Sequence, residues 1–115
     1  MSQWYTMCEL TRILPATGVC ALVNGQQIAI FRPRDDAQLY ALSNIDPFAE
    51  ASVLSRGLIA EHQHTLWVAS PLKKQRFRLS DGVCLEDESR SVASYAVRVS
   101  NGQVEVCAGQ NSFTL

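Results

Sequence analysis

The sequence predicts an all-β fold, a small antiparallel sandwich or partial barrel. Short runs of β-branched, aromatic and aliphatic residues are separated by turn signals roughly every dozen residues, which is typical of such folds. Two of these turns are Asn-Gly pairs, a strong hairpin signal because both residues tolerate positive φ. No segment of about a dozen residues shows the 3.6-residue apolar period of a helix.

The first part of the chain contains three expected strands. Trp4–Leu10 has aromatic, β-branched and sulfur side chains in a short run and is expected to open the sheet. From Val19 the run V-C-A-L-V leads through Asn24-Gly25 into Q-Q-I-A-I-F, which predicts a hairpin. After a polar break, Gln38–Ser43 is expected to form the next strand.

The rest of the chain is expected to contain a long insertion and a closing hairpin. Residues 44–82 behave as an insertion that ends in an Asp-Gly turn, and an irregular acidic connection follows over Val83–Arg90. The runs S-Y-A-V-R-V-S and Q-V-E-V-C then flank the second Asn-Gly pair, and their valines alternate with polar residues. Within the insertion, residues 49–59 are expected to form a single helical turn, limited by Gly57 and the serines. The small, polar tail from Ala108 is expected to fray.

Composition and charge narrow the class of protein. A chain of 115 residues with 47% hydrophobic residues is expected to fold as one domain over residues 1–115. The net charge of −1 argues against a nucleic-acid partner, and the apolar runs are shorter than the roughly 20 residues of a membrane-spanning helix. The four cysteines form no C-x-x-C pair and the N-terminus has no secretion signal, so free thiols in the cytoplasm are expected.

The order of these parts resembles the Rieske-type ferredoxin fold. Both have strands, a two-loop insertion, an F-x-L-x-D-G strand end and a closing hairpin, and the resemblance extends from about Trp4 to Val106. Four longer runs are similar to the small subunits of bacterial cytoplasmic NAD(P)H-dependent nitrite reductases. They are T-G-V-C-A-L-V, I-A-I-F-R-P, N-I-D-P-F-A-E-A-S-V-L-S-R-G-L-I and V-A-S-P-L-K-K-Q-R-F-R-L.

This resemblance implies a function within an enzyme complex. Proteins of this family resemble a Rieske domain without its cluster and bind a large subunit that carries FAD, sirohaem and an iron–sulfur cluster. The complex reduces nitrite to ammonium with electrons from NAD(P)H, as part of nitrate assimilation. The chain is therefore expected to be a subunit of an oxidoreductase, inactive when isolated, with no cofactor and no catalytic residue of its own.

The insertion also contains the four positions at which a Rieske centre has its ligands. A Rieske cluster is held by two cysteine thiolates and two histidine imidazoles, in the patterns Cys-x-His and Cys-Pro-Leu-His. The corresponding residues here are Asp46, Phe48, Ser70 and Lys73. Their oxygen atoms, phenyl ring and ammonium group do not replace thiolates and neutral nitrogen donors. We therefore expect a vestigial cluster-binding subdomain at about residues 44–82, with no metal.

Two structural functions are possible for Asp46. Its carboxylate is expected to accept a hydrogen bond from the backbone two residues on, which would stabilise the turn at Pro47. Alternatively, an ion pair between Asp46 and Lys73 would bridge the two loop tips in place of the metal, although an exposed pair of this kind contributes only about 0–1 kcal/mol. Packing of Phe48 into the vacated space is expected to stabilise the subdomain more, by roughly 1.5–3 kcal/mol.

A local run of positive charge suggests a docking surface. In an extended strand Lys74, Arg76 and Arg78 share one face, and Lys73 precedes them. Such a run is usually a solvated strand face. The functional interpretation is that it orients an acidic surface of the partner at the tip of the insertion.

Two other functions remain as alternatives. One is a Rieske-type electron-transfer ferredoxin with unconventional ligands, which would be brown and contain iron and acid-labile sulfide. The other is a zinc module that uses His62, His64 and Cys84, although the polar segment around the histidines favours an exposed turn, and Cys84 is typical of a small buried residue.

Overall fold

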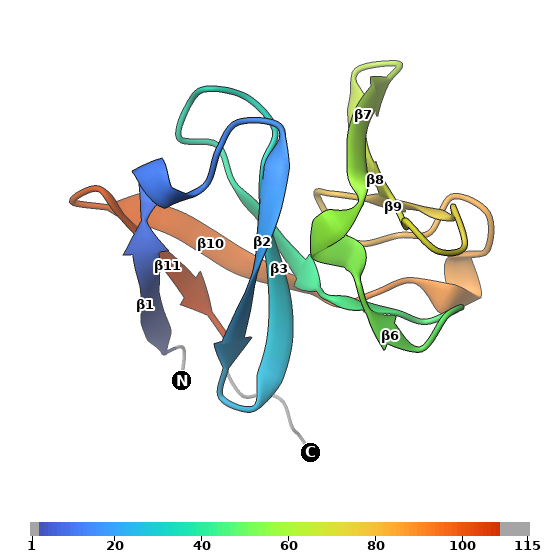
Figure 1. Ribbon diagram of the computed structural model, residues 1–115, viewed down its shortest axis with the longest axis horizontal. Coiled ribbons are helices and arrows are strands. Elements are labelled where there is room, and N and C mark those ends of the chain that lie inside the picture. The colour runs from blue at the N-terminus through green and yellow to red at the C-terminus, as the bar shows by residue number, and fades with distance from the viewer. Residues whose placement is uncertain (1–2, 109–115) are drawn as a thin grey trace.

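A curled, six-stranded antiparallel sheet forms the larger part of the computed structural model, which describes residues 3–108 (Figure 1). The order of its strands is β1-β11-β10-β4-β3-β2. Their bounds are β1 Trp4–Glu9, β2 Thr17–Val23, β3 Gln26–Arg32, β4 Tyr40–Ser43, β10 Ser94–Ser100 and β11 Gln103–Cys107. The prediction of an all-β fold with a partial barrel is thus confirmed.

Both Asn-Gly pairs form the predicted hairpins. Asn24 and Gly25 have φ angles of 53° and 81°, and Asn101 and Gly102 have φ angles of 52° and 77°. Each pair is a two-residue loop, because Val23 pairs with Gln26 across the first hairpin and Ser100 pairs with Gln103 across the second. Positive φ at both central residues matches the right-handed twist of the flanking strands, so these short sequences fix two of the strand pairings.

The strand expected after the first hairpin begins two residues later than predicted. β4 starts at Tyr40, whereas the predicted strand started at Gln38. The carboxylate of Asp36 accepts a hydrogen bond from the backbone N–H of Gln38 at 3.0 Å, which holds this segment in a turn. The pairing of β4 with β3 starts at Tyr40, opposite Phe31.

The insertion forms a smaller part beside the large sheet. Its strands are β5 Ile45–Asp46, β6 Ala51–Ser52, β7 Leu58–His62, β8 Thr65–Ala69 and β9 Arg76–Arg78. Strands β5 and β6 pair with each other, and β7, β8 and β9 form a three-stranded sheet. The helical turn predicted over residues 49–59 is shorter than the prediction. It is the three-residue 3₁₀ turn η2, Leu54–Arg56, because Ala51–Ser52 pairs as a strand instead.

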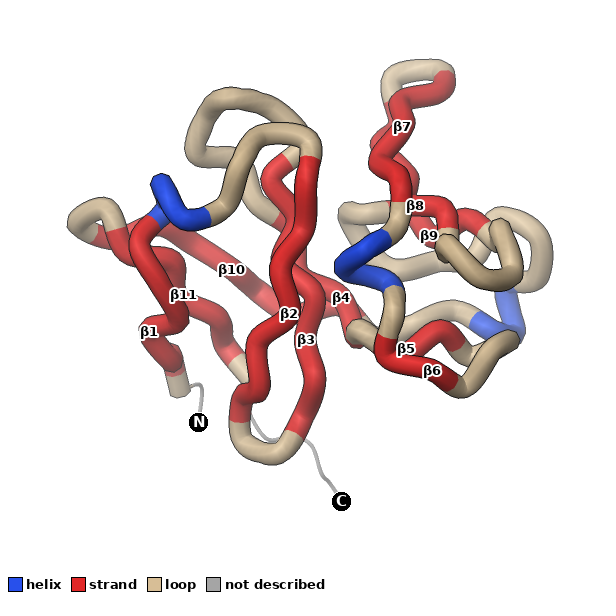
Figure 2. Tube along the Cα trace, in the orientation of Figure 1, coloured by secondary structure: helices blue, strands red, loops and turns tan. Residues whose placement is uncertain are grey.

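The other two helical turns of the described chain are equally short. They are η1, Leu10–Arg12, and η3, Glu88–Arg90, and they are coloured blue with η2 in Figure 2. The turn η3 lies in the acidic connection that was predicted to be irregular. Within residues 3–108, no helix is long and apolar enough to cross a membrane. The tail predicted to fray lies outside the described residues, except for Ala108, which is buried.

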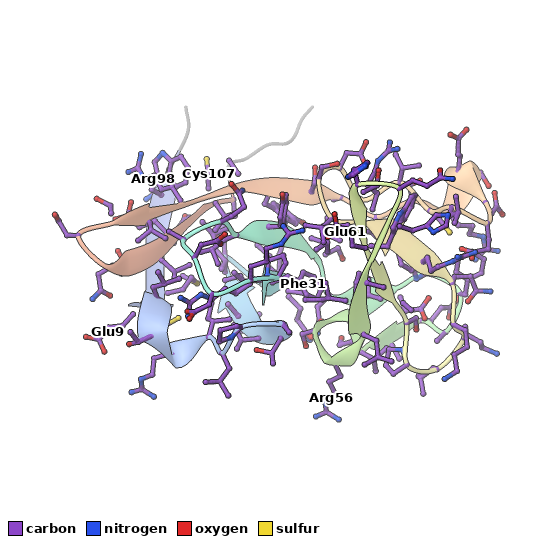
Figure 3. All side chains as sticks on the ribbon, turned by 90° about the horizontal axis from the view of Figure 1, so that it is seen from above. Glu9, Phe31, Arg56, Glu61, Arg98 and Cys107 are labelled. Atoms are coloured by element: carbon purple, nitrogen blue, oxygen red, sulfur yellow. The ribbon has the colours of Figure 1, made fainter. Side chains whose placement is uncertain are left out.

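The middle of strand β3, Ile28–Phe31, is buried on both faces and joins the two parts of the molecule. Ile28 and Ile30 face the core of the large sheet, which also contains the buried valines of β11. Ala29 and Phe31 point the other way, into a second core made with the insertion. Figure 3 shows Phe31 between the two parts. The continuous apolar run I-A-I-F therefore reflects a strand without a solvent face.

The insertion packs closely against this region of the sheet. A Cβ atom at Gly18, which pairs with Phe31, would lie 2.7 Å from the Phe31 ring and 2.9 Å from the backbone oxygen of Ser55 in η2. Only glycine gives the two backbones enough space at this point. The position of the insertion relative to the large sheet is thus fixed by direct packing.

Candidate functional site

Asp46 is fully buried at the end of β5, where its carboxylate organises the first loop tip. One carboxylate oxygen, Oδ1, accepts hydrogen bonds from the backbone N–H groups of Phe48 at 2.8 Å and Ala49 at 3.3 Å. The first of these is the turn hydrogen bond predicted from the sequence. The backbone oxygen of Asp46 also accepts a bond from Glu50 at 2.7 Å, which closes the turn.

Ser70 is the partner of Asp46 in the second loop tip. It is 1% exposed and follows β8, and its hydroxyl donates a hydrogen bond to Oδ2 of Asp46. The same hydroxyl oxygen accepts a bond from the backbone N–H of Leu72 at 3.3 Å, and the backbone of Ser70 pairs with Gln75 and Lys74. A hydrogen bond between two side chains thus joins the loops that a cluster joins in a Rieske protein.

The alternative of an ion pair between Asp46 and Lys73 is wrong. The side chain of Lys73 is exposed, and none of the ion pairs among residues 3–108 includes it. The carboxylate of Asp46 instead points inward to a neutral donor, Ser70. An exposed ammonium group gains little from such a contact in water, whereas a buried carboxylate requires hydrogen-bond donors.

Phe48 packs into the space beside the second core. It is half-buried, and its ring centroid lies 6.3 Å from that of Phe77, with an interplanar angle of 53°. The guanidinium of Arg90 lies 5.4 Å from the ring centroid of Phe48 and donates a hydrogen bond to the backbone oxygen of Pro47 at 3.0 Å. Sequence reasoning missed Arg90 because it lies more than forty residues further along the chain.

These residues do not fit a 2Fe–2S cluster. The carboxylate of Asp46 is occupied by three hydrogen bonds, Phe48 has no donor atom, and the ammonium group of Lys73 is a cation. The four cysteines of the chain do not provide the missing ligands either. Cys8, Cys20 and Cys107 lie on strands β1, β2 and β11 of the large sheet. Cys84 is fully buried and is the one thiol close to the insertion's sheet, where it bridges to Phe77. The four ligands that a cluster requires are therefore not assembled here.

The histidines and Cys84 lie at different places on the small sheet. His62 and His64 are exposed at the tip of the β7–β8 hairpin, as the sequence predicted. His62 pairs with Thr65 at this tip, whereas Cys84 bridges Phe77, which pairs with Val68 further along β8. Within the described residues, no three histidine, cysteine or acidic side chains are grouped as metal ligands. The arrangement does not support the zinc module.

The basic run is divided between a turn and a strand. Lys74 has a φ of 69° and lies in the turn before β9, so it does not continue the strand face of Arg76 and Arg78 as predicted. Arg76 pairs with Glu86 at 2.8 Å, and Arg78 donates two hydrogen bonds to Asp81, at 2.9 and 2.6 Å. The ion pairs of the described residues leave Lys73 and Lys74 without an acidic partner.

The pair formed by Arg78 and Asp81 also shifts the pKa of the carboxyl group. The hydrogen bonds from Arg78 lower the pKa of Asp81 below its usual value, and the N–H of Val83 contributes to the same shift. Asp81, which is ionised at neutral pH in any case, keeps its charge to a lower pH than a free aspartate and offsets the charge of Arg78. The positive charge of this region is concentrated on the two lysines of the turn.

Comparison with known families first defines the class of protein. A family model described as a Rieske-like 2Fe–2S domain matches residues 3–107. The match covers both the large sheet and the insertion, so the fold and the family model agree over nearly all of the described chain. Together they define a Rieske-like domain.

Individual relatives identify the family more narrowly. The small subunit of nitrite reductase (NADH) from Salmonella typhimurium is 67% identical over 106 residues, which cover 92% of this chain and 98% of the relative. The NMR structure of the Escherichia coli protein NirD is 64% identical, with a TM-score of 0.90, and covers 96% of this chain and 100% of that chain. The chain belongs to the family of nitrite reductase (NADH) small subunits, as the resemblance predicted.

A relative of a different length contains the same domain. A protein of Klebsiella oxytoca, named as the large subunit of NAD(P)H nitrite reductase, is 43% identical over 103 residues. The matched region covers 90% of this chain and 11% of that protein. In that relative, a region similar to this chain is therefore part of one much longer polypeptide.

Proposed function

We propose that this chain is a non-redox subunit that binds the large subunit of a cytoplasmic NAD(P)H-dependent nitrite reductase and supports its activity. The observation that carries the proposal is the hydrogen bond from Ser70 to Asp46 at the site of the missing cluster. A buried polar pair without thiolate or imidazole ligands keeps the loops together but gives no centre for electron transfer. The subunit then acts by contact with its partner, in the reduction of nitrite to ammonium for nitrate assimilation.

The relative from Klebsiella oxytoca supports the choice of partner. Its single chain contains a region similar to this domain together with a large-subunit sequence. Two parts of one polypeptide have a high effective concentration relative to each other, and a weak interface between them is then sufficient. In this proposal the same contact forms between two subunits, and the interface itself provides the affinity. FAD, sirohaem and the iron–sulfur cluster belong to the large subunit in this proposal.

The proposal predicts that this chain increases the activity of the large subunit. Purified large subunit, assayed for NADH-dependent nitrite reduction, should become severalfold more active when an equimolar amount of this chain is added. The reason is that a contact which orders the partner in its active arrangement raises the competent fraction of the enzyme. The isolated chain, assayed alone, should oxidise no NADH.

Two results would contradict this prediction. Equal rates with and without the chain would show that the contact does not support activity. A brown preparation with stoichiometric iron and acid-labile sulfide would instead favour the ferredoxin alternative, which an ultraviolet–visible spectrum of the purified chain tests directly.

The basic turn gives a further test of docking. Lys73→Glu combined with Lys74→Glu should weaken binding to the large subunit about tenfold at low ionic strength, because both lysines are exposed and have no acidic partner among the described residues. Arg12→Glu is the control, since Arg12 is an exposed cation on η1 beside the large sheet, away from the insertion, and its replacement should leave the affinity nearly unchanged. Titration calorimetry at low and high salt should show that the lysine effect shrinks as salt is added. Unchanged affinity at low salt would exclude docking through these charges.

A further inference from the structure

Three of the five exposed leucines of the described residues lie on the insertion or just after it, and the other two, Leu14 and Leu22, lie just before β2 and on it. Large hydrophobic side chains are usually buried, and a group of exposed ones on a soluble domain marks a site of interaction. Leu58 is 79% exposed, Leu72 is 56% exposed and Leu85 is 46% exposed. All three belong to the insertion or to the segment that immediately follows it.

The strand register brings these leucines to one end of the small sheet. Leu58 on β7 pairs with Ala69 on β8, and Ala69 pairs with Arg76 on β9. The backbone N–H of Leu85 donates to the oxygen of Arg76 at 2.9 Å, so Leu85 extends the same row. Leu72 lies in the turn that connects Ala69 with Arg76, drawn in yellow beside β9 in Figure 1.

The alternation of side chains places this row on the outer face of the small sheet. Val68 and Phe77 are fully buried in the second core, and they pair with each other. Ala69 and Arg76 are their neighbours along the strands, so their side chains point away from the core. Leu58 shares that outer face through its pairing with Ala69.

The hydrogen bond between Ser70 and Asp46 holds Leu72 in place. The hydroxyl of Ser70 accepts a bond from the backbone N–H of Leu72 and donates one to the buried carboxylate of Asp46. The turn that carries Leu72 is thus connected to the interior of the insertion. An apolar group held in one position loses little conformational freedom on binding. In this arrangement, the hydrogen bond between Ser70 and Asp46 keeps the turn in place with Leu72 at its surface.

We propose that Leu58, Leu72 and Leu85 form the surface against which the large subunit docks, with Lys73 and Lys74 at its rim. We call these three leucines the leucine face. The proposal rests on the proposed function and adds the location and chemistry of the interface. The lysines have no acidic partner in residues 3–108, so the complementary surface is an apolar patch bordered by carboxylates.

The test compares exposed leucines in different parts of the molecule. Leu58→Asp combined with Leu72→Asp should raise the Kd for the purified large subunit at least tenfold, because charges would then face an apolar patch. Leu22→Asp is the matched control: Leu22 is 71% exposed on β2 of the large sheet, and its replacement should leave the Kd within about twofold of wild type. Both variants should retain the wild-type circular dichroism spectrum and Tm, because the replaced side chains are exposed.

The salt dependence of the Kd distinguishes the contribution of the leucines to binding from that of the lysines. The loss of affinity caused by the leucine replacements should persist at high salt, whereas the loss caused by replacing Lys73 and Lys74 should decrease there.

If the leucine double variant does not fold, the single variants Leu58→Ser and Leu72→Ser replace it. Each is expected to lower the affinity about fivefold or more.

Each outcome of this experiment has a defined meaning. If the wild-type chain does not bind the large subunit, the proposed function and this inference both fail. If the wild type binds and the folded leucine variants bind equally well, the inference is overturned while the proposed function stands. Equal losses in Leu22→Asp and in the leucine double variant would also overturn it, because binding would then not be specific to this face.

Discussion

Asp46→Ala is expected to lower the free energy of unfolding by about 3 kcal/mol, because a buried hydrogen-bond donor left without a partner costs about 1–3 kcal/mol. The substitution removes the acceptor of three donors at once, namely the N–H groups of Phe48 and Ala49 and the hydroxyl of Ser70. In a domain of this size, such a loss lowers Tm by roughly 12 °C. Urea denaturation followed by circular dichroism measures it directly.

Asp46→Asn is the matched control for this substitution. The asparagine side chain keeps one carbonyl oxygen, which can still accept bonds from the two backbone N–H groups of the turn. Its amide nitrogen faces the Ser70 oxygen, and the hydroxyl can accept from it in place of donating. We expect the free energy of unfolding of this variant to fall by about 1 kcal/mol, which is the range for one altered hydrogen bond. If Asp46→Ala were within about 0.5 kcal/mol of wild type, as surface substitutions usually are, the carboxylate would not organise the loops.

Gly82→Ala is expected to lower the free energy of unfolding by about 4 kcal/mol, which is more than the positive φ alone would explain. Gly82 has a φ of 81°, and an added Cβ would overlap the backbone oxygen of Val92. The backbone of Gly82 also donates a hydrogen bond to Arg78 at 2.6 Å and accepts one from Val92 at 2.9 Å. A shift that relieves the overlap would break these bonds, so the connection between the insertion and β10 would loosen.

Gly25 provides a control with the same backbone conformation. Its φ is also 81°, but a Cβ added at Gly25 on this exposed hairpin would have no neighbouring atom within 4 Å. Gly25→Ala therefore carries only the conformational cost of about 1–2 kcal/mol. Thermal and urea unfolding of both variants isolates the steric contribution at Gly82. An equal decrease in the free energy of unfolding of the two variants would contradict the close packing between Gly82 and Val92.

Local sequence signals predicted much of the fold. The two Asn-Gly pairs predicted two hairpins, and the structure has both, because a two-residue loop with positive φ allows few alternatives. The alternating valines of the closing hairpin and the apolar run of β3 identified strands of the main sheet. The second core also includes Cys84 and Val92, beyond the Asp-Gly turn at which the predicted insertion ends.

The contacts within the site depended on long-range packing and were not predictable in the same way. Asp46 and Ser70 are twenty-four residues apart, and the sequence left open which residue of the second loop would meet the carboxylate. Lys74 is part of a run that alternates like a strand, and nothing local indicates its φ of 69°. Leu58 precedes another apolar residue, Ile59, so alternation does not show which of them is exposed.

The double burial of β3 has a consequence for how the complex responds to heat. Phe31 belongs to a core that the insertion completes, while Ile30, its neighbour, belongs to the core of the large sheet. Opening either core exposes part of the same strand, which couples the unfolding of the two parts into one cooperative transition. A partner that binds the insertion therefore protects the distant sheet from thermal denaturation as well, through mass action on the native state.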